Sequence, residues 1–449
     1  MARLPVVLIH GYSDVGISFE RWREALVGRG YTATTIHLGE YVTLSNDITV
    51  KDIAEGLDRA LRIRAGIGAD DPFDAIVHST GMLVVREWLT GFAARKNRLK
   101  HLIGLAPATF GSPLAHKGRS WLGALFKGNK QPGPDFLAAG DRILSALELG
   151  SAYTWALAHK DLLADTAVYG PTARTPYPFI FIGLKDYGWI KRLFTEPGTD
   201  GTVRWSGAGF NSRKITLDLT TARARRGRRV TVEPWRNVDV PLVFVPDLNH
   251  GTILRDPSDA LIAMTEAALD VGSRAEYDAW RDKNVKAGVR ALKQSKGRRW
   301  QQFVVHALDE RGDAINDFYV EIGTVVGGKF KGFDQFELDV HTFKDDSSFR
   351  CFHVDLDALG KQASADLQMR IVADSGTELV GYVGFQDEGI PLGPVGAKES
   401  IFDAAVALSE PLDRQKVAFF YPFTTTLLEV RMDREPLPVE GVNRVFKFL

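Results

Sequence analysis

A serine lies within one short stretch whose pattern could support nucleophilic chemistry. Residues 73–88 begin with an apolar run at Ala75–Val77, pass through Ser79 and Gly81, and continue with apolar residues at helical spacing. This pattern predicts a buried strand, a tight turn with Ser79 at its apex, and a helix. Negative charge that develops at Ser79 would meet the unpaired N–H groups at the start of that helix. We therefore predict that Ser79 is a nucleophile.

A serine hydroxyl needs a base within hydrogen-bond reach, and the base needs an acid that orients it. Of the ten histidines, His250 is the best candidate base, because it lies in a loop just after a predicted strand. Asp200 is the favoured acid, since it lies in a glycine-flanked turn between Ser79 and His250 in chain order. Asp186 follows a predicted strand more closely and stays the alternative, whereas Asp247 could instead cap the turn before His250.

Ester or amide cleavage also requires two N–H groups that stabilise the negative oxygen of the tetrahedral intermediate. The backbone amide of Thr80, at the start of the predicted helix, is one candidate. The amide of Tyr12, directly after His10 and Gly11, is the second. Only backbone groups are needed at these positions, so the side chains there are uninformative.

The elements that must position these residues alternate between strands and helices. Strands are predicted at 6–9, 32–38, 75–77, 99–105, 178–184 and 240–245, and helices at 19–27, 50–63 and 257–269. This alternation predicts an α/β fold with a mostly parallel sheet, whose functional loops lie at the carboxyl ends of the strands. Residues 114–175 instead predict aromatic-rich helices. These form either an ordinary helical subdomain or a cap whose apolar face lines an acyl pocket.

Four of these segments resemble the α/β-hydrolase superfamily, and more narrowly its lipases and carboxylesterases. They are the strand that ends in His10-Gly11, the turn at Ser79, the loop at Asp200-Gly201, and Asn249-His250-Gly251, in the family's order of Ser, Asp and His. Residues 106–115 resemble a further segment of such lipases, and the resemblance covers about residues 4–270. One departure is Val77, which stands where the family's Gly-x-Ser-x-Gly turn has its first glycine.

The chain length and a change in composition predict two domains. We expect a catalytic domain over 1–275, a charged helical connector over 276–299, and a β-sandwich accessory domain over 300–449. The strands expected in the last domain are 303–308, 318–322, 336–340, 349–356, 369–372, 379–385 and 417–423. A hairpin is expected within the first domain at 215–219 and 230–232, around an arginine-rich tip at Arg223–Arg229.

The composition narrows the class of partner. Lys and Arg total 56, as do Asp and Glu, so no basic field favours nucleic acid. No run of 18 apolar residues predicts a membrane span, the first residues do not resemble a signal peptide, and the one cysteine, Cys351, excludes an internal disulfide. We expect a cytoplasmic protein; the sequence does not indicate its oligomeric state.

Together these features predict a serine hydrolase of carboxylic esters that needs no metal or organic cofactor. The apolar cap residues favour a lipid-like acyl ester, which would make the protein a lipase or esterase. The alternatives are a phospholipase, an acyltransferase or amidase with the same triad, and a binding protein without catalysis. A lipid interface could involve the cap, the Arg223–Arg229 tip or the C-terminal domain.

Overall fold

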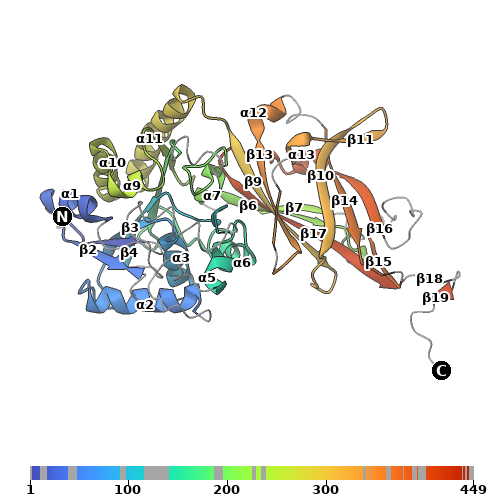
Figure 1. The fold of residues 1–449 in the computed structure, drawn as a ribbon, viewed down its shortest axis with the longest axis horizontal. Helices are drawn as coiled ribbons and strands as arrows, with labels where there is room; N and C mark the ends of the chain where they lie inside the picture. Colours follow the sequence, from blue (N-terminus) through green and yellow to red (C-terminus); the bar gives the residue numbers. More distant parts are fainter. Residues whose placement is uncertain are drawn as a thin grey trace, which may run out of the picture. The chain divides into compact units, whose positions relative to one another are not determined.

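The chain forms two compact units in the computed structural model (Figure 1). Unit 1 comprises residues 1–211 and 235–298, and unit 2 comprises residues 212–234 and 299–449. The residues that the structure describes are 3–10, 18–38, 48–91, 98–115, 141–186, 196–224, 229–233, 239–336, 340–343, 345–360, 366–377, 379–386, 392, 401–436, 438–439 and 442–443. No helix in these ranges is both long enough and apolar enough to cross a membrane.

Unit 1 is built on a six-stranded sheet in which every described pair of neighbours is parallel. In spatial order the strands are β2 (Ala33–His37), β1 (Val6–His10), β3 (Phe73–His78), β4 (Leu99–Leu105), β5 (Tyr177–Gly183) and β8 (Leu242–Val245). The central strands are buried along almost their whole length. Such continuous apolar strands are expected where helices cover both faces of a parallel sheet.

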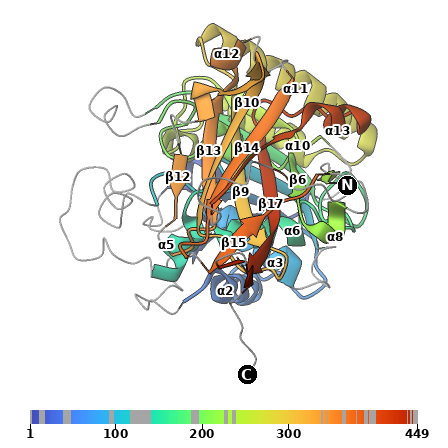
Figure 2. The same ribbon diagram turned by 90° about the vertical axis from the view of Figure 1, so that its right-hand side faces the viewer.

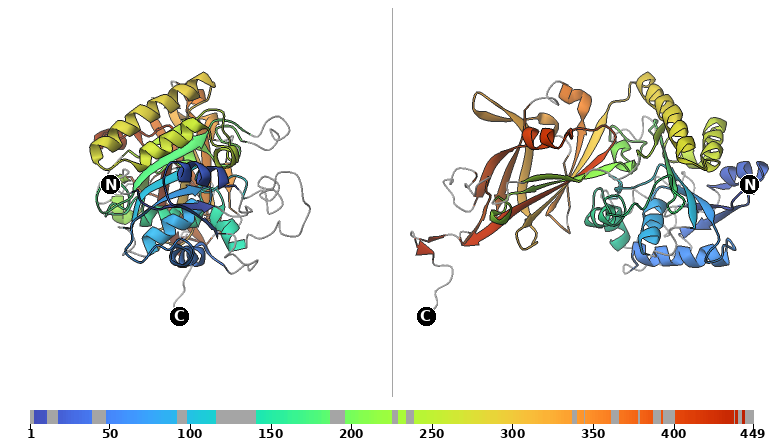
Figure 3. Two further views of the ribbon diagram at one scale, coloured as in Figure 1. Left: turned by 90° about the vertical axis from the view of Figure 1, so that its left-hand side faces the viewer. Right: turned by 180° about the vertical axis from the view of Figure 1, so that it is seen from behind.

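Helices lie on both sides of this sheet (Figure 3, left). On one side are α1 (Glu20–Gly28), α9 (Thr252–Arg255), α10 (Asp259–Leu269) and α11 (Arg274–Gln294), which share a core with the strands. On the other are α2 (Val50–Ile63), α3 (Gly81–Gly91), α5 (Asp141–Leu147) and α6 (Ala152–Lys160). The short α7 (Trp205–Ala208) completes the described helices of unit 1. Part of the expected cap, residues 116–140, lies outside the described residues.

Helix α11 is an integral part of unit 1, although its residues fall largely in the charged segment expected to form a connector. The ring of Trp280 lies 4.7 Å from that of Phe179 on β5, and Tyr277 is fully buried. A side chain at Gly288 would come within 2.7 Å of the backbone nitrogen of Phe244, so the helix lies directly on β8. Most charged side chains of this helix are exposed, and only a narrow stripe of residues that includes Tyr277 and Trp280 is buried.

Unit 2 is a sandwich of two sheets (Figures 1 and 2). The larger sheet has the order β12 (Val340–Thr342), β13 (Phe349–Asp355), β9 (Trp300–Asp309), β17 (Thr425–Pro436), β6 (Ser212–Asp218) and β7 (Val230–Glu233), and β15 (Val380–Val383) also pairs with β17. The smaller has the order β11 (Lys329–Gly332), β10 (Asp317–Val326), β14 (Leu367–Asp374) and β16 (Ile401–Ala407). Apolar side chains from both sheets form one core.

Short helices and a separate pair of strands complete the described part of unit 2. They are α8 (Thr221–Ala224), η4 (Asp334–Phe336), α12 (Leu356–Leu359), α13 (Ser409–Arg414), β18 (Pro438–Val439) and β19 (Val442–Asn443). The strand predicted at 417–423 is wrong. The one predicted at 336–340 is wrong at its first residue, whereas Val340 begins β12 and residues 337–339 lie outside the described residues. Phe336 lies in the 3-10 helix η4, and residues 417–423 form a loop before β17 in which Phe423 has a φ of +61°. Apolar runs that fill a core from a loop produce the same sequence signal as strands.

The hairpin of β6 and β7 forms as expected, but its residues belong to unit 2 rather than to the expected range 1–275. β6 pairs with β17 in parallel, and the fully buried side chains of Ile215 and Leu217 lie in the sandwich core. A strand with one apolar face can complete either unit, so chain order alone does not reveal this excursion. Most of the arginine-rich tip, residues 225–228, lies outside the described residues.

Candidate active site

Ser79 occupies a strained turn between β3 and α3. Its φ is +53°, a value that costs energy for a residue other than glycine and persists only where neighbouring structure enforces it. The Ser79 amide donates to the carbonyl of Leu105 at 3.2 Å, and the Ser79 carbonyl accepts from the amide of Ala108 at 3.1 Å. Both partners lie at the end of the neighbouring strand β4 or just after it. The predicted strand, turn and helix are therefore present.

The small residue that such a turn needs is on the adjacent strand. Val77 is in register with Gly104 of β4. A side chain at Gly104 would meet the Cε atom of Met82 at 2.8 Å and the Cδ1 atom of Ile180 at 2.9 Å. The absence of a side chain at Gly104 thus makes room for helix α3 beside a valine-bearing strand. An isolated glycine within an apolar strand is the signal that could have indicated this.

The structure brings Ser79, His250 and Asp200 together in one hydrogen-bonded row. Nε2 of His250 lies 3.0 Å from Oγ of Ser79, and Nδ1 lies 3.0 Å from Oδ2 of Asp200. All three residues are buried, with 4% of Ser79 exposed and none of the other two. A carboxylate can only accept at Nδ1, so this nitrogen carries the proton and Nε2 is left to accept from the serine hydroxyl. This arrangement can withdraw a proton from Ser79.

The two other carboxylates considered for the acid lie at the surface. Asp186 lies shortly after the end of β5 and is exposed. Asp247 is exposed in a turn with a φ of +65° and forms an ion pair with Lys185 at 2.8 Å. Asp200, in contrast, also accepts a hydrogen bond through its backbone carbonyl from the amide of His250 at 3.0 Å.

The carboxylate of Asp200 is held by its own turn. Its Oδ1 atom accepts from the backbone amides of Thr202 at 3.0 Å and Val203 at 2.8 Å. Gly201, between Asp200 and Thr202, has a φ of +97°, which favours glycine. Such charge-assisted bonds orient a carboxylate and stabilise its ionised form. Oδ2 is thereby directed at the imidazole.

Residues 106–115, noted for their resemblance to lipases, support this acid loop from below. Oγ of Ser112 donates to the carbonyl of Thr202 at 2.6 Å. Oγ1 of Thr109 donates to the carbonyl of Ala208, in the helix after the acid loop, at 2.6 Å. Both hydroxyl groups are buried, and both donate to backbone carbonyls in the segment that follows Asp200. The sequence resemblance marked the segment, but only the structure shows that it contacts the residues that follow Asp200.

The loop that carries His250 depends on a glycine and an asparagine that sequence reasoning assigned no role. A side chain at Gly183 would come within 2.2 Å of the carbonyl oxygen of Leu248, so the loop lies directly on the end of β5. Oδ1 of Asn249 accepts from the amides of Gly251 at 3.1 Å and Thr252 at 2.9 Å. This is an Asx turn, and it starts α9 immediately after the histidine.

Three buried histidine rings lie in a row beneath the site. The ring of His78 lies 4.7 Å from that of His250 and 5.5 Å from that of His10. Nε2 of His78 donates to the backbone carbonyl of His250 at 2.9 Å. Burial, reinforced by the two neighbouring imidazoles, holds the pKa of His78 well below its usual value. His78 is therefore neutral at neutral pH and supports the backbone of His250.

Of the two backbone amides predicted to stabilise an oxyanion, the structure describes that of Thr80. Thr80 lies between Ser79 and the first residue of α3, as predicted, and its carbonyl accepts from the amide of Leu83 at 3.0 Å. Its amide therefore lies at the N-terminal end of a helix. Tyr12 lies outside the described residues.

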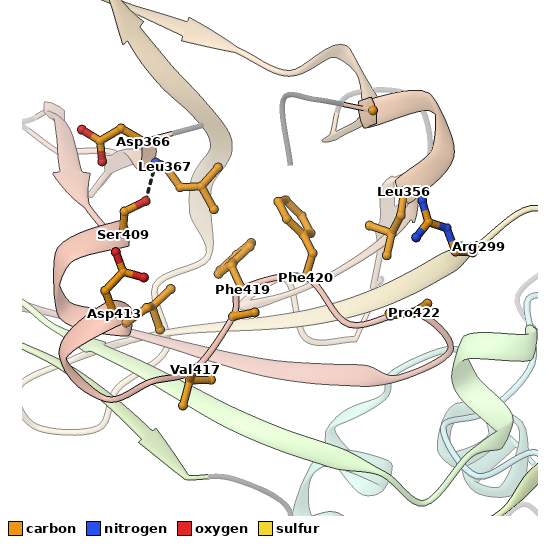
Figure 4. Close-up of a pocket in the computed structure, with 13 residues that line it drawn as sticks. Arg299, Leu356, Asp366, Leu367, Ser409, Asp413, Val417, Phe419, Phe420 and Pro422 are labelled. Atoms are coloured by element: carbon orange, nitrogen blue, oxygen red, sulfur yellow. Dashed lines mark hydrogen bonds between the residues drawn. The ribbon is translucent and has the colours of Figure 1, made fainter. Parts of the chain in front are cut away.

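A separate cavity of about 710 Å³ lies in unit 2, and none of the residues that line it belongs to the Ser79 row (Figure 4). Phe419 and Phe420, from the loop before β17, form its apolar floor, and Asp366 and Asp413 lie at one side. The Oγ atom of Ser409 accepts from the amide of Leu367. The described residues of its lining include no histidine and no cysteine. The cavity has a size typical of ligand pockets, but its lining does not provide a nucleophile with a base.

Comparison with known proteins places this geometry in a wider context. No protein-family model and no curated protein sequence matches the chain. Among solved structures it is similar to phospholipase PlaB from Legionella pneumophila, with a TM-score of 0.78 and 21% identity, over 100% of this chain and 96% of that chain. The complex of that phospholipase with thio-NAD gives a TM-score of 0.75 and 20% identity, over 99% and 96% of the two chains.

A weaker similarity, with a TM-score of 0.38, links the chain to the mature lipase BlEst2 of Bacillus licheniformis, at 15% identity over 60% of this chain and 92% of that chain. The similarity to PlaB, in contrast, spans both units. At 21% identity it identifies a fold. The predicted fold class is thereby confirmed: the chain adopts the α/β-hydrolase fold in unit 1 and carries a β-sandwich in unit 2.

Proposed function

We propose that this protein is a serine hydrolase that cleaves carboxylic esters of lipids. The observation that carries the proposal is the buried row Ser79–His250–Asp200, with 3.0 Å at each step and the serine at a φ of +53°. Nucleophile, base and acid in this geometry are the components of acyl transfer through an acyl-enzyme. The similarity to a phospholipase over both units supports a lipid as the source of the acyl group.

The first half of the reaction forms the acyl-enzyme. Oγ of Ser79 attacks the ester carbonyl carbon while Nε2 of His250 takes the hydroxyl proton. Asp200 stabilises the imidazolium that results and keeps the proton of Nδ1 in place. The oxyanion accepts hydrogen bonds from the amides of Thr80 and Tyr12. The tetrahedral intermediate then collapses, the ester C–O bond breaks, and His250 gives its proton to the departing alcohol.

The second half releases the acid. Water enters in place of the alcohol, His250 takes one of its protons, and the hydroxide attacks the acyl carbon. The second tetrahedral intermediate releases the fatty acid as Oγ of Ser79 regains a proton from His250. No redox step is involved. We further propose that the described part of the expected cap, residues 141–175 with helices α5 and α6, contributes apolar surface to the acyl pocket.

Replacement of Ser79 by alanine tests the nucleophile. The variant should lose p-nitrophenyl ester and phospholipid turnover, and it should no longer be labelled by a fluorophosphonate, while its circular dichroism stays that of the wild type. Mass spectrometry of the labelled wild type should find the adduct on Ser79. Ester turnover that survives in the variant would refute the assignment. Absence of labelling in the folded wild type would favour a binding protein without catalysis.

Replacement of the two rival acids provides a matched pair. Asp200→Asn should lower kcat by about 10⁴-fold, because an amide no longer enforces the productive tautomer of His250. Asp186→Asn removes the same charge from an exposed position and should leave kcat unchanged. The opposite pattern would assign the acid to Asp186. Comparison of ester and amide substrates, with and without an added alcohol, separates hydrolysis from amidase or acyltransferase activity.

A further inference from the structure

One hairpin of unit 2 ends in open space. Strands β10 and β11 are joined by Gly327 and Gly328, with φ values of +59° and +77°, as in a tight two-residue hairpin turn. A side chain at either glycine would meet no atom within 4 Å. β11 is the edge strand of its sheet, and the hairpin extends beyond the other strands of that sheet (Figure 1). We call residues 325–331 the β10–β11 tip.

The β10–β11 tip exposes apolar side chains at its end. Val325 is 41% exposed and Val326 is 61% exposed. Among the large apolar side chains in the described residues that are exposed to this degree, these two alone are adjacent in the chain. Phe330 lies opposite Val325 in the register and is half-buried. Isolated exposed apolar residues are ordinary, whereas here two lie next to each other at a projecting turn.

The same tip is positively charged. Lys329 lies opposite Val326, Lys331 lies opposite Thr324, and both lysines are exposed. The sequence between residues 322 and 333 contains no acidic residue. Within the described part of the chain, neither lysine has an ion-pair partner. Val326 and Lys329 thus flank the turn at the same level, and Lys331 lies two residues further from it.

We propose that the β10–β11 tip docks on an anionic lipid bilayer. The two valines enter the headgroup region, and the lysine ammonium groups bind lipid phosphates. Lys329 lies level with Val326 beside the turn, and Lys331 lies two residues, about 7 Å, further back, so both ammonium groups can reach lipid phosphates on their flexible stems while the valines lie among the headgroups. A stable protein interface needs about 800 Å² from each partner, which two valines do not supply.

This proposal depends on unit 2 alone and is tested without catalysis. All variants are made in the full chain carrying Ser79→Ala, so that lipid is not consumed. Binding is measured by co-sedimentation with vesicles of phosphatidylcholine mixed with phosphatidylglycerol, and with pure phosphatidylcholine. The double variant Lys329→Gln with Lys331→Gln should bind the anionic vesicles about thirty-fold more weakly. Lys283→Gln with Lys286→Gln, on α11 of unit 1, removes the same charge and should bind as the parent does.

Insertion of the valines is read with a fluorescent label. Cys351 is fully buried, so a thiol dye added to the folded Val326→Cys variant is directed to the tip. An environment-sensitive dye such as NBD should shift to shorter wavelength with anionic vesicles. The same dye at Val27→Cys, a 48% exposed position in unit 1, should not shift.

Three results would overturn the proposal. The first is that the parent does not bind anionic vesicles, and the second is that the two lysine pairs prove equally important. The third is a dye shift that grows with protein concentration in the absence of lipid, which would show that a second copy of the chain covers the tip. Weaker binding at high salt, in contrast, is expected because the lysines act through charge.

Discussion

The ion pair between Arg86 and Asp161 should be the most sensitive point for the stability of unit 1. Arg86 lies on α3, two turns after Ser79, and Asp161 directly follows α6. Both side chains are fully buried, and the guanidinium meets the carboxylate at 2.7 and 2.9 Å. Its third contact is the carbonyl of Thr109 at 2.6 Å. Burial opposes this charge, but the carboxylate more than compensates and raises the pKa of Arg86.

Asp161→Asn keeps the size of the side chain and removes its charge, so a buried guanidinium is left without compensation. Loss of one partner from a buried ion pair costs about 3 to 5 kcal/mol. A domain of this size loses about 2 to 4 °C in Tm per kcal/mol, so the expected fall is roughly 6 to 20 °C. Replacement of both residues, Arg86→Met with Asp161→Leu, should restore part of the loss, because no buried charge then remains.

Tryptophan fluorescence during urea unfolding is a suitable assay, because every tryptophan except Trp300 belongs to unit 1. The control is Glu55→Gln, which breaks an exposed ion pair with Arg59 on α2 and should cost less than about 1 kcal/mol. If Asp161→Asn lowers the free energy of unfolding no more than Glu55→Gln does, the Arg86–Asp161 pair does not lie in a water-free interior, and the expected loss of about 3 to 5 kcal/mol is wrong. If the double variant is as unstable as the single one, the loss comes from packing rather than from charge.

Three other changes test how the site is supported. Both ring nitrogens of His101 face acceptors, Asp74 at 2.7 Å and a backbone carbonyl at 2.7 Å, and although burial opposes the charge, these acceptors raise the pKa of His101. The free energy of unfolding of the wild type should therefore exceed that of His101→Gln by its largest amount below about pH 6.5, and this difference should decline as the pH rises through the raised pKa of His101. A difference in urea unfolding that stays flat or rises with pH would contradict this. Gly183→Ala should displace the loop that carries His250 and lower kcat at least about tenfold. The control is Gly91→Ala, where a side chain meets nothing within 4 Å and kcat should not change. Equal kcat values for the two variants would show that the close contact at Gly183 is not needed for turnover. His78→Phe should lower kcat about tenfold, with KM nearly unchanged, because it removes the hydrogen bond to the backbone carbonyl of His250; the loss of this bond to a buried carbonyl should also cost about 1 to 3 kcal/mol of stability. A kcat within twofold of the wild type would show that the bond is dispensable for turnover.

Much of unit 1 could be predicted because its signals are local. The strands of the parallel sheet are continuous apolar runs, and helix α2 spans Val50–Ile63 as its spacing predicts. The residues of the row Ser79–His250–Asp200 were predictable for a related reason. A serine between a strand and a helix, a glycine-flanked aspartate and a histidine after a strand are each recognisable within a few residues. Their order along the chain then fits one family.

Other features depend on contacts between residues distant in sequence, and the sequence did not reveal them. Gly104 compensates for Val77 only because the two strands lie in register. The excursion of residues 212–234 into unit 2 was missed because a strand with one apolar face suits either core. Residues 417–423 were expected to form a strand because periodicity cannot distinguish a strand from a loop that fills a core.

For this protein, the sequence by itself determined the fold class, the position of the Ser79 turn and a short set of candidate partners for that serine. The tertiary structure decided which carboxylate meets the imidazole, since Asp200 and Asp186 differ little as sequence but one is buried and the other exposed. It also showed that His78, Gly183 and residues 106–115 hold the row in place. The physical reason is that a hydrogen bond of 3.0 Å is made by side chains 50 and 171 residues apart, and packing alone sets that distance.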